Sequence, residues 1–278
     1  METPFMLGPV CLTLHYEAKT LYPGETSLMH VTIPYNAIRG MLTAYGERQI
    51  NNTQYNMVAL TFDDGPVYAN TARVLNSLRH HGTQATFFMV GTLIEENRDI
   101  ALRAHDELHS LQSHHYRHVS KSSILHIQED TQKMYDLMTS TWGLGPWLFR
   151  APYDRYDHFI EAGVNLPMIS YDVDGKDGAG RSPGNVLRTV QEQVHDGAII
   201  RLHDSSDNAA EAVDLITEWL HANGYLCVTV EELFIHNQQE MVPNEVFRNV
   251  TPKYKNDSGR WGNWPPESFV RREPHEIQ

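Results

Sequence analysis

Two adjacent carboxylates stand at the end of a strand-like run. Asp63 and Asp64 follow the apolar segment MVALTF and are followed at once by Gly65 and Pro66. Neighbouring side chains on a strand point to opposite faces, so a regular strand would have to bury one of the two charges. Where a strand breaks into a turn, both carboxylates can instead face one cavity from different angles. The pair therefore indicates a reaction site.

Two histidines add metal-binding chemistry. His114 and His118 are four residues apart in the segment SHHYRH, a spacing that places both on one face of a helical turn. Two imidazole nitrogens and one carboxylate oxygen suit a borderline metal such as Zn²⁺, and three protein ligands leave a position for water, as in catalytic sites. The chain contains 16 histidines, so the spacing alone is also compatible with a pair that binds nothing.

The elements that must position these groups alternate between short apolar runs and helix-like segments. Amphipathic stretches such as AAEAVDLITEWLHANG separate the runs, and this one closes with a glycine typical of a helix end. Such an order predicts an α/β fold with about seven parallel strands, in a sheet that is open or closed into a barrel. The predicted strands are 57–63, 85–90, 108–113, 147–151, 167–173, 198–203 and 226–230.

Reactive side chains follow five of these seven strands. Besides the two segments above, RAPYD follows the fourth strand, DVDGKD the fifth and RLHD the sixth. In a barrel of parallel strands, catalytic groups gather at the carboxyl ends of the strands. Each group taken singly is compatible with a structural role, but their joint placement predicts a metal-dependent hydrolase.

The segments TFDDG, SHHYRH, RAPY, DGKD and RLHD, in this order, resemble the five motifs of the NodB-homology polysaccharide deacetylases, carbohydrate esterase family 4. The resemblance covers residues 57–235 and implies a distorted (β/α) barrel. It also implies that Asp63 is the general base, held by Arg150. The implied metal ligands are Asp64, His114 and His118, and the implied metal is divalent, with Zn²⁺ favoured and Co²⁺ as the alternative.

The later motifs supply the remaining roles that the resemblance implies. His203 would be the general acid, and either Asp174 or Asp177 would orient it. The backbone N–H of Tyr153 would face the developing oxyanion, and Leu202 would line the acetyl pocket.

Three positions depart from the family pattern. His115 stands where Ser or Thr often follows the first metal histidine, Asp154 replaces a common Gly, and Gly178 replaces a usual Trp. The first two supply no ligand or proton. The third removes an aromatic wall of the substrate groove and puts the substrate preference in doubt.

The expected reaction is hydrolysis of N-acetyl groups on N-acetylglucosamine polymers, with chitin or chitooligosaccharides favoured. Peptidoglycan deacetylase and acetylxylan esterase are the alternatives within the enzyme class. A non-catalytic carbohydrate-binding relative would be expected to lack the base, a metal ligand or the acid, and all of these residues are present. The expected partner is therefore a polysaccharide, and the sequence predicts no particular oligomeric state.

Composition excludes other partners. The formal net charge is −13, whereas binding a nucleic-acid backbone needs a surplus of Lys and Arg. No run of about 18 apolar residues is present, so no membrane span is expected.

The apolar start MLGPVCLTL lacks the features of a signal peptide, although the resemblance favours a secreted or cell-wall location. Cys11 and Cys227, the only cysteines, are compatible with one disulfide or with two thiols.

Three regions are predicted along the chain. Residues 1–56 are expected to form an N-terminal extension with isolated strands at CLTLHYEA and LMHVTIPY. Residues 57–235 form the deacetylase-like domain, and residues 236–278 form an irregular tail.

Overall fold

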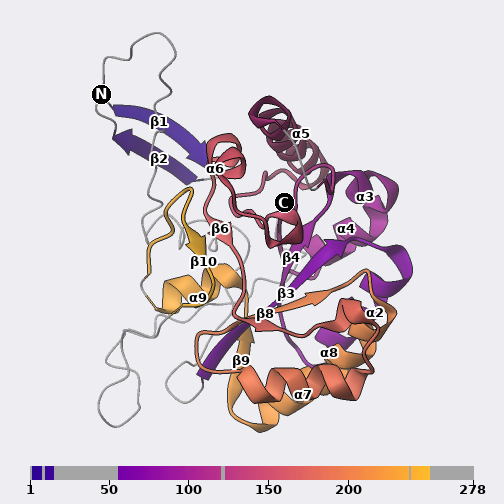
Figure 1. The fold of residues 1–278 in the computed structure, drawn as a ribbon. Helices are drawn as coiled ribbons and strands as arrows, with labels where there is room; N and C mark the ends of the chain where they lie inside the picture. Colours follow the sequence, from indigo (N-terminus) through magenta and orange to yellow (C-terminus); the bar gives the residue numbers. More distant parts are fainter. Residues whose placement is uncertain (1, 8–9, 16–55, 120–122, 238, 251–278) are drawn as a thin grey trace, which may run out of the picture.

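The computed structural model describes residues 2–7, 10–15, 56–119, 123–237 and 239–250 (Figure 1). The helices are α2 (Tyr68–His80), α3 (Gly91–Glu96), α4 (Arg98–Asp106), α5 (Ile124–Trp142), α6 (His158–Val164), α7 (Pro183–Gln193), α8 (Asp207–Ala222) and α9 (Val230–His236), with 3₁₀ turns η1 (Pro152–Asp154) and η2 (Asp177–Ala179). The strands are β1 (Glu2–Leu7), β2 (Val10–His15), β3 (Asn56–Gly65), β4 (Thr86–Met89), β5 (Ser110–Ser113), β6 (Met168–Ile169), β7 (Val173–Asp174), β8 (Ile199–His203), β9 (Tyr225–Val228) and β10 (Val246–Phe247).

A parallel sheet forms the centre of the molecule. Its strands follow the order β5-β4-β3-β8-β7, and β9 pairs with the first part of β3. Phe149 bridges Ser113 of β5 and Met168 of β6, and β6 pairs in parallel with β10, so the array continues past β5. The α/β fold with a parallel sheet is confirmed, and its arrangement is consistent with a distorted barrel.

Two predicted strands are shorter than expected. Segment 147–151 forms only the bridges at Phe149, and segment 167–173 gives the short strand β6 before β7 begins at Val173. The reason is that Arg150 redirects hydrogen bonds that a ladder would use. The carbonyl oxygen of Arg150 lies against His114 Nδ1, and its guanidinium donates to the carbonyl oxygens of Ile169 and Ser170.

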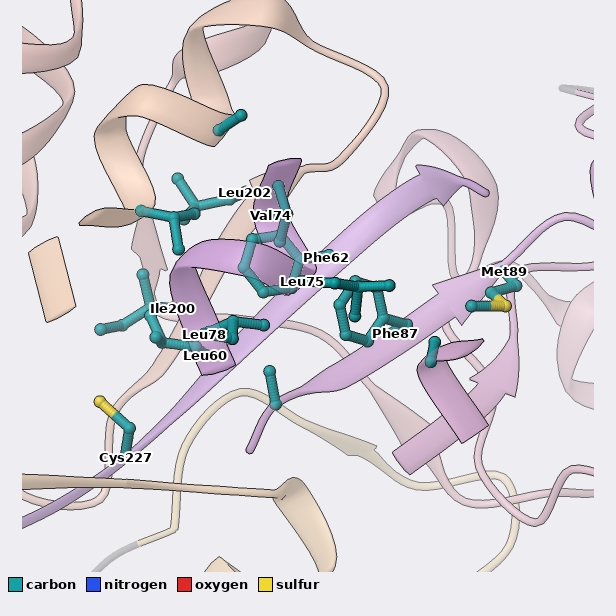
Figure 2. Packing of buried hydrophobic residues seen from close by; sticks show 14 of the residues in the cluster. Leu60, Phe62, Val74, Leu75, Leu78, Phe87, Met89, Ile200, Leu202 and Cys227 are labelled. Atoms are coloured by element: carbon teal, nitrogen blue, oxygen red, sulfur yellow. The ribbon is translucent and has the colours of Figure 1, made fainter. Parts of the chain in front are cut away.

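Alternating side chains give the sheet two different faces. On β3, Leu60 and Phe62 pack with Leu75 of α2 and with Ile200 of β8, as Figure 2 shows. Residues of opposite parity, such as Ala59, belong to a second buried cluster on the other face. Helices α2, α8 and α7 pack side by side over the first face, and we call the opposite face of the sheet the inner face.

The domain continues beyond the predicted boundary at residue 235. Met241 and Val250 are fully buried in the inner cluster, and β10 pairs with β6. At the other end of the chain, β1 and β2 form an antiparallel hairpin, of which only the second strand was expected. The predicted strand LMHVTIPY and residues 251–278 lie outside the described residues.

Two further expectations concern membranes and cysteines. Within the described residues, no helix has the length and apolar character needed to cross a membrane. Cys227 is buried in the core, whereas the side chain of Cys11 lies outside the described part of the structure.

Candidate active site

The adjacent carboxylates are turned into one cavity by an irregularity at the end of β3. Asp63 is the last residue in regular register, opposite His203 of β8, and the register with β4 shifts between Asp63 and Gly65. Asp64 has a φ of 69°, in the left-handed region that few residues other than Gly adopt. Gly65 is required here, because a Cβ atom on it would lie 2.0 Å from a carboxylate oxygen of Asp204.

Asp64 meets the two predicted histidines. Its Oδ1 lies 3.2 Å from Nε2 of His114 and 3.1 Å from Nε2 of His118. The three ligand atoms lie within 4.8 Å of one another, and within the described residues this is the one cluster of three His, Cys, Asp or Glu side chains with that geometry. One carboxylate oxygen and two imidazole nitrogens suit a borderline divalent cation.

Neighbouring groups prepare these ligands for a cation. The Nδ1 of His114 lies 2.9 Å from the carbonyl oxygen of Arg150, and since a carbonyl only accepts, Nδ1 carries the hydrogen and Nε2 keeps its lone pair. Burial alone would raise the pKa of Asp64, but the adjacent His114 and His118 lower that pKa well below its usual range, so the carboxylate is ionised. The residues present therefore fit a divalent metal ion.

Asp63 is held by a buried guanidinium. Arg150 is 1% exposed, and its Nη1 donates to Asp63 Oδ1 at 2.8 Å and to Thr61 Oγ1 at 2.7 Å. Its Nε and Nη2 donate to the carbonyl oxygens of Ile169 and Ser170. All three nitrogens are thus used, and the buried charge of Asp63 has a counter-charge that is fixed in place.

His203 is oriented by Asp177. The backbone N–H of His203 donates to Asp177 Oδ2 and its Nδ1 lies against Asp177 Oδ1, both at 2.9 Å. Burial alone would lower the pKa of His203, but the hydrogen bond and the charge of Asp177 outweigh it and raise that pKa. Nδ1 therefore carries a hydrogen that it donates to Asp177. Nε2 is the ring nitrogen that does not contact Asp177.

Of the two candidates for orienting His203, Asp177 is the one that contacts its ring. Asp174 does not touch His203; its Oδ2 accepts from Arg201 at 2.9 Å and its Oδ1 accepts from the backbone of Lys176.

These groups line one cavity of about 160 Å³. Tyr153 stands at its side in a left-handed conformation with a φ of 60°, and its ring is 62% exposed and lies 4.5 Å from the ring of His118. The lining residues are Asp63, Asp64, His114, His118, Arg150, Ala151, Tyr153, Asp154, Tyr171, Arg201 and His203.

Leu202 differs from expectation. It is fully buried among Leu60, Phe62 and the residues of α2, on the helix-covered face of the sheet (Figure 2), and it does not line the cavity. Since side chains alternate along a strand, it is Arg201 that shares the inner face with His203. Arg201 and Tyr171 were both missed, although the two-residue spacing from Arg201 to His203 was visible in the sequence.

Comparisons with known proteins show which family this chain resembles. The family profile described as polysaccharide deacetylase matches residues 50–166. The peptidoglycan-N-acetylglucosamine deacetylase PgdA of Listeria monocytogenes is 32% identical over 64% of this chain, and the chain spans only 38% of the length of that relative.

Two solved structures are also similar. One is described as T48 deacetylase with substrate, at 30% identity and a TM-score of 0.66, covering 69% of this chain and 96% of the other. The second is a family 4 acetyl xylan esterase from Clostridium thermocellum in complex with a cobalt ion, at 28% identity and a TM-score of 0.65, covering 70% of this chain and 98% of the other.

The chain thus has the fold of the polysaccharide deacetylases and an Asp-His-His cluster that fits a divalent metal ion. The chain belongs to the polysaccharide deacetylase family, carbohydrate esterase family 4.

Proposed function

We propose that this protein is a metal-dependent de-N-acetylase of a cell-wall polysaccharide, with peptidoglycan as the preferred substrate. The observation that carries the proposal is that one cavity holds the three-residue metal cluster together with a carboxylate paired to a guanidinium and a histidine paired to a carboxylate. The peptidoglycan deacetylase among the relatives favours this substrate over chitin, which the sequence alone had favoured. A cell-wall location follows from the same substrate.

The chemistry must overcome a poor electrophile and a poor leaving group. A divalent cation, for which we favour Zn²⁺, would lower the pKa of a water molecule and polarise the acetyl carbonyl. Asp63 would accept the proton of the attacking water at Oδ2, because Oδ1 is held by Arg150. The backbone N–H of Tyr153 would donate to the carbonyl oxygen as negative charge develops on it.

His203 would complete the reaction as general acid. Its imidazolium would deliver the Nε2 proton to the amide nitrogen as the C–N bond breaks, which releases acetate and a free amine. Asp177 supports this role in two ways, since it fixes the ring and stabilises the protonated form.

Two single substitutions test the division of labour between the adjacent carboxylates. Asp63→Asn should keep bound metal and lose roughly 10²- to 10⁴-fold in rate, the usual contribution of a positioned base. Asp64→Asn should lose metal affinity first, with activity partly recovered at high metal concentration. Asp106→Asn is a matched control, because this exposed carboxylate lies outside the cavity and pairs with His105.

The measurements are metal content, by elemental analysis, and acetate released from peptidoglycan, chitin oligomers and acetylxylan. A chelator should abolish acetate release, and Zn²⁺ or Co²⁺ should restore it. Full activity of metal-free protein would contradict the metal-dependent reaction, and equal metal affinity in both variants would contradict the separate roles. Faster turnover of chitin or acetylxylan than of peptidoglycan would overturn the substrate assignment.

A further inference from the structure

A second guanidinium faces the cavity and is used differently from the first. Arg150 has every nitrogen engaged by protein acceptors, so it serves as a fixed counter-charge. Arg201 donates one hydrogen bond, from Nη2 to Asp174. Within the described residues, its Nε and Nη1 have no acceptor.

The position of Arg201 follows from the register of β8. Ile200 and Leu202 point into the core beneath α2, and the residues between and beyond them point to the inner face. Arg201 therefore lies two residues before His203 on the same side of the strand, and both line the cavity. Leu202 was expected to line the acetyl pocket, but β8 presents the cation Arg201 to the cavity instead.

The guanidinium is held in a fixed orientation. Its central carbon lies 4.0 Å from the centroid of the Tyr171 ring, and its Nη2 is fixed by Asp174 at 2.9 Å. Burial opposes the charge, but Asp174, Tyr171 and Asp63 together outweigh this effect and raise the pKa of Arg201, so the guanidinium stays charged. Tyr171 covers one face of the guanidinium, Asp174 holds Nη2 and Nε is buried, so Nη1 is the donor that remains for a ligand.

We propose that Arg201 is a specificity-determining residue that binds a carboxylate carried by the substrate next to the reacting N-acetyl group. This inference rests on the proposed deacetylase function and narrows it to acidic N-acetylated saccharides. Arg–carboxylate hydrogen bonds are among the stronger ones in proteins, and the Arg201 side chain is preorganised for one. The carboxylate can come from two sources, a lactyl ether on the same sugar, as in muramic acid, or a neighbouring uronic acid.

The first test changes only the substrate, so no variant has to fold. Parent protein loaded with Zn²⁺ is assayed on an oligosaccharide containing N-acetylmuramic acid, on its methyl ester and on a chitin oligomer of equal length. The free acid should have a KM about 10- to 100-fold lower than the ester, as expected for loss of one charge-assisted hydrogen bond. A disaccharide of N-acetylglucosamine and glucuronic acid, with its own methyl ester, distinguishes the second source.

The second test changes the protein. Arg201→Gln should abolish the difference in KM between the free acid and the ester, and Arg201→Lys should restore part of that difference. Calorimetric binding of the acid and the ester to Asp63→Asn protein, with and without Arg201→Gln, gives the same comparison without turnover.

The possible outcomes separate the two proposals. If acid and ester bind equally, or if Arg201→Gln weakens all substrates alike, Arg201 only supports the loop that carries Asp177, and the inference is overturned. If no substrate releases acetate although the acid binds more tightly than the ester, the carboxylate site stands and the proposed reaction fails.

Discussion

Asp177→Asn isolates the contact that sets the protonation of His203. The substitution keeps the size and the buried position of the side chain, which is fully shielded from solvent, and removes its charge. Hydrogen bonds to charged groups contribute about 1.5–3 kcal/mol and neutral ones about 0.5–1.5 kcal/mol. The midpoints of these ranges differ by about 1.3 kcal/mol, so the variant should lose roughly this much preference for the imidazolium, which is about one pKa unit.

The expected result is a change in pH dependence rather than a uniform loss. Because His203 acts in its protonated form, the alkaline limb of kcat/KM should move about one unit toward acid, with a rate loss of about tenfold on that side. The same contact affects stability. Since the pKa of His203 is raised in the folded state, its stabilising effect is complete below about pH 6.5 and is lost as the pH rises through the raised value.

The assay is acetate release across the pH range, with circular dichroism and metal content as controls for folding. Asp174→Asn is the matched comparison, because Asp174 lies in the same loop and pairs with Arg201 instead of His203. An unshifted alkaline limb in Asp177→Asn, or the same shift in both variants, would refute the reasoning.

Two further predictions use residues that border the site. A Cβ on Gly178 would lie 3.6 Å from the His203 ring, an ordinary contact, so Gly178→Trp should change KM for polymer more than it changes metal affinity. Equal kinetics on short and long substrates in both forms would show that this position does not line the groove. Burial raises the pKa of Asp204 to about 7, so its stabilising effect is present at low pH and is lost as the pH rises through 7. Asp204→Asn, which keeps an acceptor for Thr71, should gain melting temperature relative to the parent between pH 5 and 8, and a constant difference would contradict the raised pKa.

Much of the fold and the site could be predicted because the signals are local. The apolar runs gave the main strands, and the polar segments after them gave the groups that the structure brings into one cavity. The face occupied by Leu202 was also predictable. Because successive side chains of a strand point to opposite faces, Leu202 must lie on the face of β8 opposite to that of its neighbour His203. What the sequence left open was the choice between Asp174 and Asp177, which depends on the left-handed turn at Lys176.

Non-local contacts account for the remaining differences. The strands around Phe149 are short because the guanidinium of Arg150 donates hydrogen bonds to carbonyl oxygens that are distant in sequence. The pairing of β10 with β6 joins segments about 80 residues apart. The sequence of residues 236–250 has no hydrophobic periodicity that would predict a strand there. Such contacts are set by the assembled sheet rather than by any local run of residues.

The pairing of β10 with β6 has a practical consequence for protein engineering. Arg248, just after β10, donates to Ser170 Oγ at 2.9 Å and approaches Asp154 Oδ2 at 3.5 Å, and Asp154 directly follows Tyr153 in the cavity wall. A recombinant fragment that ends at the last family motif would keep every reactive group. It would lose the contacts of Arg248 with Ser170 and Asp154 and the buried side chains of Met241 and Val250. Expression boundaries, chimeras and C-terminal fusions should therefore leave the chain intact through residue 250.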